Sequence, residues 1–170
     1  MMLALRLVAR AATAVGMAAM LCGGPAMAPR SVSAADPHGM ALRQDRHGIR
    51  IEVDGRPFAT YVVDQANKPY LWPVIGPTGK AMTRSYPMED LSTEPAAQKD
   101  HPHQRGITFG HEDMAGSENW PDRGTFAKEP EGSPRLAKLG SIAHREFTLL
   151  SVDGGRAIVE EICDHRDGTG

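Results

Sequence analysis

Short stretches in which apolar and polar residues alternate recur through the middle and the end of the chain. From Gly48 to Val53, isoleucine or valine stands at every second position, which predicts a strand with one buried face. Asp54-Gly55 is a two-residue hairpin signal, so 56–63 is expected to return as the partner strand. No helical repeat of apolar residues persists beyond the N-terminal segment. The pattern therefore predicts an all-β domain.

The other predicted strands are 70–75, 106–111, 137–150 and 156–162. Pro73 restricts the first of them to a sheet edge or a bulge, because proline has no backbone N–H to donate. In the second, alternation places Phe109 and His111 on one face, and both Phe109 and Trp72 are expected to be core residues.

The intervening segments, 86–105 and 112–134, are expected to be loops. Short strands at this spacing favour an antiparallel β-sandwich over 48–170. Because the chain ends soon after its last predicted strand, one sheet edge is left open, and we expect a domain truncated at its C-terminus.

The first 35 residues differ from the rest of the chain. Arg6 and Arg10 precede an apolar run over 11–21, small residues follow, and the first acidic residue is Asp36. These are the features of a secretory signal, so a signal-peptide helix is expected over 1–35, and the mature protein is expected to be periplasmic or secreted.

Cleavage is expected between Ala28 and Ala35, and 36–47 is expected to be a flexible linker. A retained membrane anchor is an alternative, but the arginines shorten the apolar run well below the ~20 residues that a span needs. Lipidation of Cys22 is another, although Leu21 is large where a lipoprotein signal has a small residue. We therefore expect no stable membrane span after signal removal.

Composition narrows the possible functions. The net charge is −2, and removing the signal takes away three arginines and no acid, so a nucleic-acid partner is not expected. Cys163 is then the only cysteine, which excludes an intrachain disulfide in the mature chain. All seven histidines lie in the mature part, which favours histidine and carboxylate chemistry.

The densest group of chemically active residues spans 100–113, with three histidines, three carboxylates and an arginine. His101 and His103 lie in the predicted loop and His111 at the end of the next strand, so three imidazoles can converge. They are candidate ligands of a divalent metal, or, with Asp113, candidate general acids and bases. A hydrogen-bonded loop without chemistry is the third interpretation.

Three further residues are candidates for holding a ligand. Arg105 suits a carboxylate or a pair of sugar hydroxyls, although a salt bridge to Asp100 or Asp113 is an alternative. Trp120 follows the histidine group and can stack on a sugar ring, and Tyr86 is a second aromatic candidate. The remaining histidines are isolated in the sequence and are expected to be surface or structural residues: His38, His47, His144 and His165.

Several blocks follow one another in an order that resembles the DUF6807 family, which carries the label "methane oxygenase PmoA" or "PmoA family protein". They are PYLWPVIGP at 69–77, TRSYPM at 83–88, DHPHQRG at 100–106, FGHED at 109–113 and Asn119-Trp120. The resemblance spans 50–120, and the hairpin after residue 135 also fits. It implies a galactose-mutarotase-like supersandwich of which this chain covers the N-terminal half.

The same resemblance bears on the candidate residues. Those that match its motif block are Asp100, His101, His103, Arg105, His111 and Asp113, while Gln104 stands where a further histidine is common. Nothing after residue 35 is apolar enough to span a bilayer, unlike the membrane subunit of methane monooxygenase, so the label is not read as the activity.

Three classes of function follow. The first is an exported carbohydrate-active lyase, hydrolase or epimerase that uses the histidine-rich loop for acid/base or metal-assisted chemistry on a sugar or glycoside. The second is a non-catalytic glycan-binding module or an inactive fragment. The third is the metal-dependent oxidoreductase that the family label suggests. The expected partner is a small molecule or a glycan.

Overall fold

Two β-sheets make up the part of the chain that the computed structural model describes, residues 2–9, 33–35, 37 and 39–168. The larger sheet has the order β2-β3-β4-β5-β6-β7, so strands that follow one another in sequence are neighbours in space. Its strands are β2 (Ser33–Ala35), β3 (Met40–Asp45), β4 (Gly48–Val53), β5 (Arg56–Val62), β6 (Tyr70–Val74) and β7 (Ile107–Thr108).

The predicted hairpin at Asp54-Gly55 is confirmed. Val53 pairs with Arg56, and the two turn residues have positive φ values of 51° and 71°. A two-residue turn with both residues in this region has the twist that antiparallel strands need, and glycine adopts it without steric cost. The turn residues thus set the register in which β4 and β5 pair.

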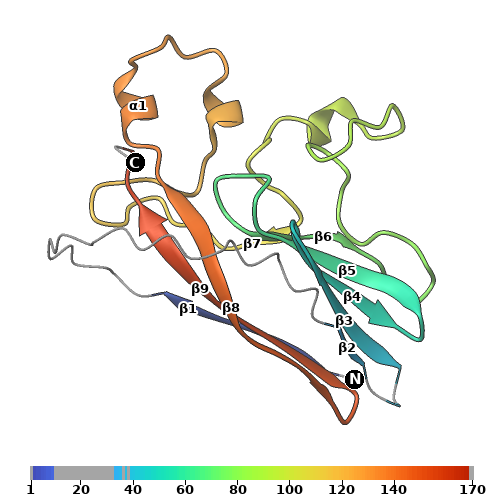
Figure 1. Cartoon of the computed structure of the whole chain (residues 1–170). Coiled ribbons are helices and arrows are strands. Elements are labelled where there is room, and N and C mark those ends of the chain that lie inside the picture. The colour runs from blue at the N-terminus through green and yellow to red at the C-terminus, as the bar shows by residue number, and fades with distance from the viewer. Residues whose placement is uncertain (1, 10–32, 36, 38, 169–170) are drawn as a thin grey trace, which may run out of the picture.

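The smaller sheet has the order β1-β9-β8. β8 (Ser141–Asp153) and β9 (Arg156–Arg166) form the second predicted hairpin around Gly154-Gly155, and β1 (Met2–Ala9) lies parallel to β9. Figure 1 shows this long hairpin as a layer of its own beside the larger sheet, with the connecting loops gathered toward one end.

The core lies between the two sheets. Ile49 and Ile51 of β4 and Val159 of β9 are all but completely buried, and they belong to one cluster with residues of β3, β5 and β6. Apolar burial of this kind stabilises a fold by roughly 25 cal/mol per Å² removed from water. The prediction of an all-β, sandwich-like fold is confirmed.

Two details of the strand prediction are wrong. The expected linker over 36–47 contains β3, whose Met40 and Leu42 are each only 1% exposed in the core. The strand expected over 106–111 is only Ile107–Thr108, and Phe109, expected in the core, is 56% exposed. The apolar residues Met40 and Leu42 mark β3, and Pro37 and Gly39 ahead of them are turn residues, but so short an apolar run does not by itself distinguish a strand from a linker.

Pro73 lies where its missing N–H does no harm. β7 pairs with β6 only at Tyr70 and Leu71, and the pairing of β5 with β6 shifts register between Ala59 and Tyr61. The predicted bulge is therefore present at this proline.

The predicted secretion signal stays a prediction. The apolar run over 11–21 lies outside the described residues, while 2–9 form β1 rather than a helix. Among the residues that the structure describes, no helix has the length and apolarity to cross a bilayer.

The core assignment predicts different costs for two isoleucine truncations. Ile51→Ala should lower the free energy of unfolding by about 2–5 kcal/mol, because it leaves a cavity between the sheets. Ile107→Ala, at a side chain that is 57% exposed, should change it by less than about 0.5 kcal/mol. Urea unfolding of both variants measures the difference, and equal losses would contradict this position for the core.

Candidate functional site

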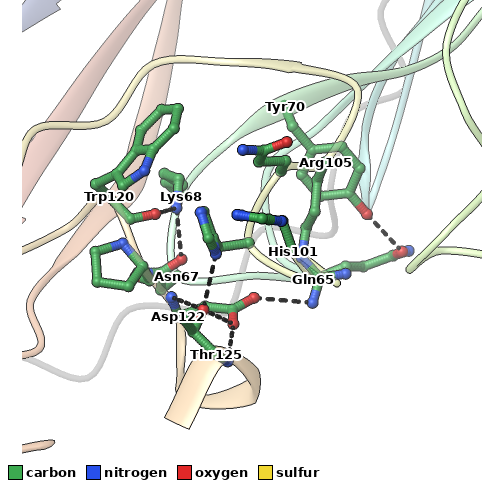
Figure 2. Close-up of polar contacts among 12 residues, drawn as sticks. Gln65, Asn67, Lys68, Tyr70, His101, Arg105, Trp120, Asp122 and Thr125 are labelled. Carbon is green, nitrogen blue, oxygen red and sulfur yellow. Dashed lines mark hydrogen bonds and ion pairs between the residues drawn. The ribbon is translucent and has the colours of Figure 1, made fainter. Parts of the chain in front are cut away.

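Three loop segments bring most of the candidate residues together. The first, 65–70, leads into β6; the second, 101–105, precedes β7; the third, 119–125, contains the start of the 3₁₀ helix η2 (Arg123–Phe126). Figure 2 shows Lys68, Trp120 and Asp122 from these segments around one cluster of polar contacts. Segments far apart in the sequence thus form one candidate site.

His103 lies at the centre of this site. Its residue is only 7% exposed, and its ring makes edge contacts with His101 on one side, at 5.5 Å between centroids, and with Trp120 on the other, at 5.6 Å. Burial, followed by the charge of Lys68, lowers the pKa of the His103 imidazole below its usual value. The ring is therefore neutral at neutral pH.

The hydrogen bonds of Thr125 determine which nitrogen of His103 carries the proton. The Thr125 hydroxyl donates to Oδ1 of Asp122 at 3.2 Å, so it accepts the bond that joins it to His103 Nδ1 at 3.0 Å. Nδ1 is then the protonated nitrogen, and Nε2 has a free lone pair with no hydrogen-bond partner among the described residues. A neutral imidazole in this tautomer is a base at Nε2.

Asp122 caps the helix η2 and, through Thr125, also positions His103. Its side chain accepts from the Thr125 backbone N–H at 3.0 Å and the Thr125 hydroxyl bonds back to the Asp122 N–H, which forms a capping box. The same carboxylate pairs with Arg105 through Nη2 at 3.1 Å. The fold of this short turn therefore sets the position of His103.

Arg105 is held by one end only. Its Nε is buried and has no hydrogen-bond partner. A buried donor left unpaired costs about 1–3 kcal/mol, so such groups are uncommon outside functional sites. The sequence alternatives for Arg105 were Asp100 or Asp113, whereas the structure pairs it with Asp122.

Lys68 adds a buried cation. It is 3% exposed, and Nζ donates to the carbonyl of Trp120 at 2.7 Å and to Oδ1 of Asn67 at 3.2 Å. Burial lowers the pKa of its ammonium group to about 8, Asp122 partly opposes this, and Arg105 adds to it. With Arg105 and one carboxylate nearby, the cluster carries an excess of positive charge.

His111 contributes to the site through its backbone, which holds the segment that contains Trp120. Its carbonyl accepts from the N–H groups of Asn119 and Trp120, both at 3.0 Å, and its N–H donates to Oδ1 of Asn119 at 2.6 Å. Its exposed ring accepts instead from the N–H of Asp113 at 3.1 Å, and the Asp113 carboxylate accepts from Gly116. His111 and Asp113 thus shape the turn that carries Trp120.

The residues do not fit the three-histidine metal site that the sequence suggested. His101 and His103 are neighbours, but the exposed ring of His111 is engaged in its own turn through Nδ1. In the described ranges, no group of three or more His, Cys, Asp or Glu side chains is arranged to hold a metal ion.

Tyr86 is linked to the site indirectly. The Arg84 guanidinium lies 5.9 Å from the centre of the Tyr86 ring and donates to the carbonyls of His101 and Gln104. Trp72, half-buried, donates from Nε1 to the Arg84 carbonyl at 3.0 Å. The two aromatic residues therefore support the loop that carries the histidines.

Sequence reasoning missed Lys68, Asp122 and Thr125. Lys68 stands directly before a strand that begins with buried residues, which is a weak signal. Asp122 and Thr125 have the spacing of a helix cap, which the sequence does show. Only the fold reveals that this cap faces His103.

The family model described as "Family of unknown function (DUF6807)" matches residues 48–170. The chain belongs to the DUF6807 family. No curated protein and no solved structure matches it. The matched range contains all the residues that form the site, so this site is part of the DUF6807 domain itself.

The lowered pKa of Lys68 predicts a pH-dependent contribution to the stability of this DUF6807 protein. Between about pH 8, the pKa of Lys68 in the folded protein, and pH 10.5, the ordinary pKa of a lysine, the unfolded chain binds the lysine proton more tightly than the folded chain. Stability rises with pH wherever the unfolded state binds more protons, so the lysine penalty should disappear over this window.

The measurement is urea unfolding of the wild type and Lys68→Met at about pH 7.5 and about pH 10. The wild type should gain free energy of unfolding relative to the variant at the higher pH. Taking the difference between the two proteins cancels groups that titrate in both. If the difference in free energy of unfolding between the two proteins does not change with pH, the lowered pKa of Lys68 is contradicted.

Proposed function

We propose that this DUF6807 protein is an exported carbohydrate-active protein in which His103 is the general base. The observation that carries the proposal is the neutral His103 ring, held through Nδ1 with Nε2 unpaired and set between His101 and Trp120. General bases in enzymes combine such a fixed tautomer with a pKa that keeps them unprotonated.

The surrounding groups suit a sugar. The half-buried Trp120 offers a flat ring for the apolar face of a pyranose, and the Arg105 side chain, which is 22% exposed, has further guanidinium N–H groups besides the one bonded to Asp122 that can donate to a hydroxyl. The excess positive charge from Lys68 and Arg105 would stabilise negative charge that develops on a sugar oxygen. These contacts support binding and proton transfer at the same place.

The proposed reaction is proton transfer in a lyase, hydrolase or epimerase. Nε2 of His103 accepts a proton from the sugar and becomes an imidazolium, which Asp122 stabilises through Thr125. His101 is the more exposed imidazole, with 48% of its side chain accessible, and it is the group placed to exchange that proton with solvent.

A glycan-binding module without catalysis is the second candidate. The low exposure of His103 favours it, because a base that is 7% exposed has little surface for a substrate atom. In that case binding depends on Trp120 and Arg105, and His103 serves to position the loop.

His103→Gln should lower turnover by about 10²–10⁴-fold on a sugar substrate identified by screening, because it removes the general base. Trp120→Ala should weaken binding by about tenfold through the lost stacking surface. Phe109→Ala, which removes an exposed ring outside the site, is the matched control and should change neither.

Product analysis by mass spectrometry and titration calorimetry separate the two candidates. Glycan binding that requires Trp120, with no product formed, would support the binding module and contradict the enzyme. Full turnover by His103→Gln with an intact fold would overturn the catalytic assignment, and no affinity for any glycan would overturn both.

A further inference from the structure

A second polar pocket, lined in part by Asn67, does not include His103. Its volume is about 400 Å³, and its walls come from the segment after β5, the start of β8 and the end of β9. Its charged or titratable lining residues are Arg46, Asp64, His144 and Arg166. None of them belongs to the site described above.

Behind this pocket lies a fully buried carboxylate. Glu161 of β9 is 0% exposed, its Oε2 accepts from the Tyr61 hydroxyl, and its Oε1 lies 2.5 Å from Nδ1 of His144. Burial and the neighbouring Glu161 raise the pKa of Tyr61, so the phenol remains a donor. A buried acid of this kind persists only where its oxygens are hydrogen-bonded.

The contact with Glu161 fixes the orientation of His144. A carboxylate that accepts at Oε1 requires a proton on Nδ1 of His144, so in the neutral ring Nε2 is the acceptor nitrogen. The Phe147 ring packs on the imidazole at 4.4 Å between centroids. His144 lines the pocket, and no hydrogen bond to its Nε2 occurs within the described part of the chain.

Arg46 is also held in place. Nδ1 of His47 contacts Oδ2 of Asp64 at 2.7 Å, and Nε of Arg46 donates to Nε2 of His47 at 2.7 Å. In this series of hydrogen bonds Arg46 donates only from Nε. Its two terminal nitrogens therefore keep the fork geometry that binds a carboxylate. Arg166, at the end of β9, is exposed and lines the same pocket.

We propose that this pocket is a second ligand site, for a small hydroxylated carboxylate such as a sugar acid. Arg46 and Arg166 bind the carboxylate, and Nε2 of His144 accepts a hydrogen bond from a hydroxyl of the same molecule. Glu161 is a positioning residue that sets the tautomer of His144. The proposal does not depend on the function proposed for the His103 site.

Titration calorimetry at neutral pH with glucuronate, galacturonate, glucose, acetate and glucose 6-phosphate tests the ligand class. At least one uronate should bind, with glucose and acetate about tenfold weaker or more, because each lacks one of the two recognised groups. Equal affinity for glucose or acetate would overturn the proposal, as would tighter binding of the phosphate or no binding of either uronate.

Variants locate the ligand. Arg46→Met and Arg166→Met should each weaken uronate binding by about tenfold, since each removes a charge-assisted contact. Arg50→Met, at an exposed arginine of β4 outside the pocket, is the matched control and should leave binding unchanged. Affinity that falls in Trp120→Ala but not in Arg166→Met would place the ligand at the other site and overturn the proposal.

The role of Glu161 has its own measurement. Nitrogen-15 NMR of the histidine rings should show His144 in the Nδ1–H form in the wild type, and its Nε2 resonance should shift when a uronate is added. In Glu161→Gln, checked for folding by circular dichroism, the preference for Nδ1–H should be lost. A His144 protonated at Nε2 in the wild type would overturn the assignment, even if the variant failed to fold.

Discussion

Glu161 occupies an inward-facing position of β9, and the partners that it requires tie the two sheets together. The same face of this strand buries Ala157, Val159 and Cys163, so the carboxylate lies in an apolar layer. Tyr61 from the larger sheet and His144 from the neighbouring strand donate to its two oxygens. Because an unpaired buried charge is strongly destabilising, this contact specifies how β5, β8 and β9 must lie relative to one another. Burial, and after it the nearby Glu161 carboxylate, raises the pKa of the Cys163 thiol to about 12. The thiol is therefore protonated and unreactive.

In the loops, too, buried charged groups are held by specific partners. Lys68, Arg105 and Asp122 lie together with little access to water, and each is held by carbonyls, by a cap or by its neighbour. Asn67 stands between this cluster and the second pocket, donating to the carbonyls of Pro121 and Gly140. Polar groups that are satisfied in this way are rigid, and rigidity is what allows two imidazoles to keep one tautomer each. Both proposed sites depend on this feature, although they share no ligand-contacting residue.

The strands were largely predictable because their signals are local. Patterns of only a few residues predicted these elements: the alternation over 48–53, the turn at Asp54-Gly55 and the glycine pair before Arg156. The prediction failed where the signal was too short, as for Met40 and Leu42 of β3, or where a strand ended early, as at Phe109. Strand ends depend on how many neighbours a strand finds, and β7 pairs at only two positions.

By itself the sequence determined the all-β class, the two hairpins, the membership of the DUF6807 family and the proximity of His101 to His103. Only the tertiary structure decided that His111 turns away, that Lys68 and Asp122 join His103, and that His144, isolated in the sequence, lies on Glu161. The physical reason is range. Turn chemistry and alternation act between residues that are adjacent in the chain, whereas burial and the pairing of charges depend on segments that meet only after the sheets have packed.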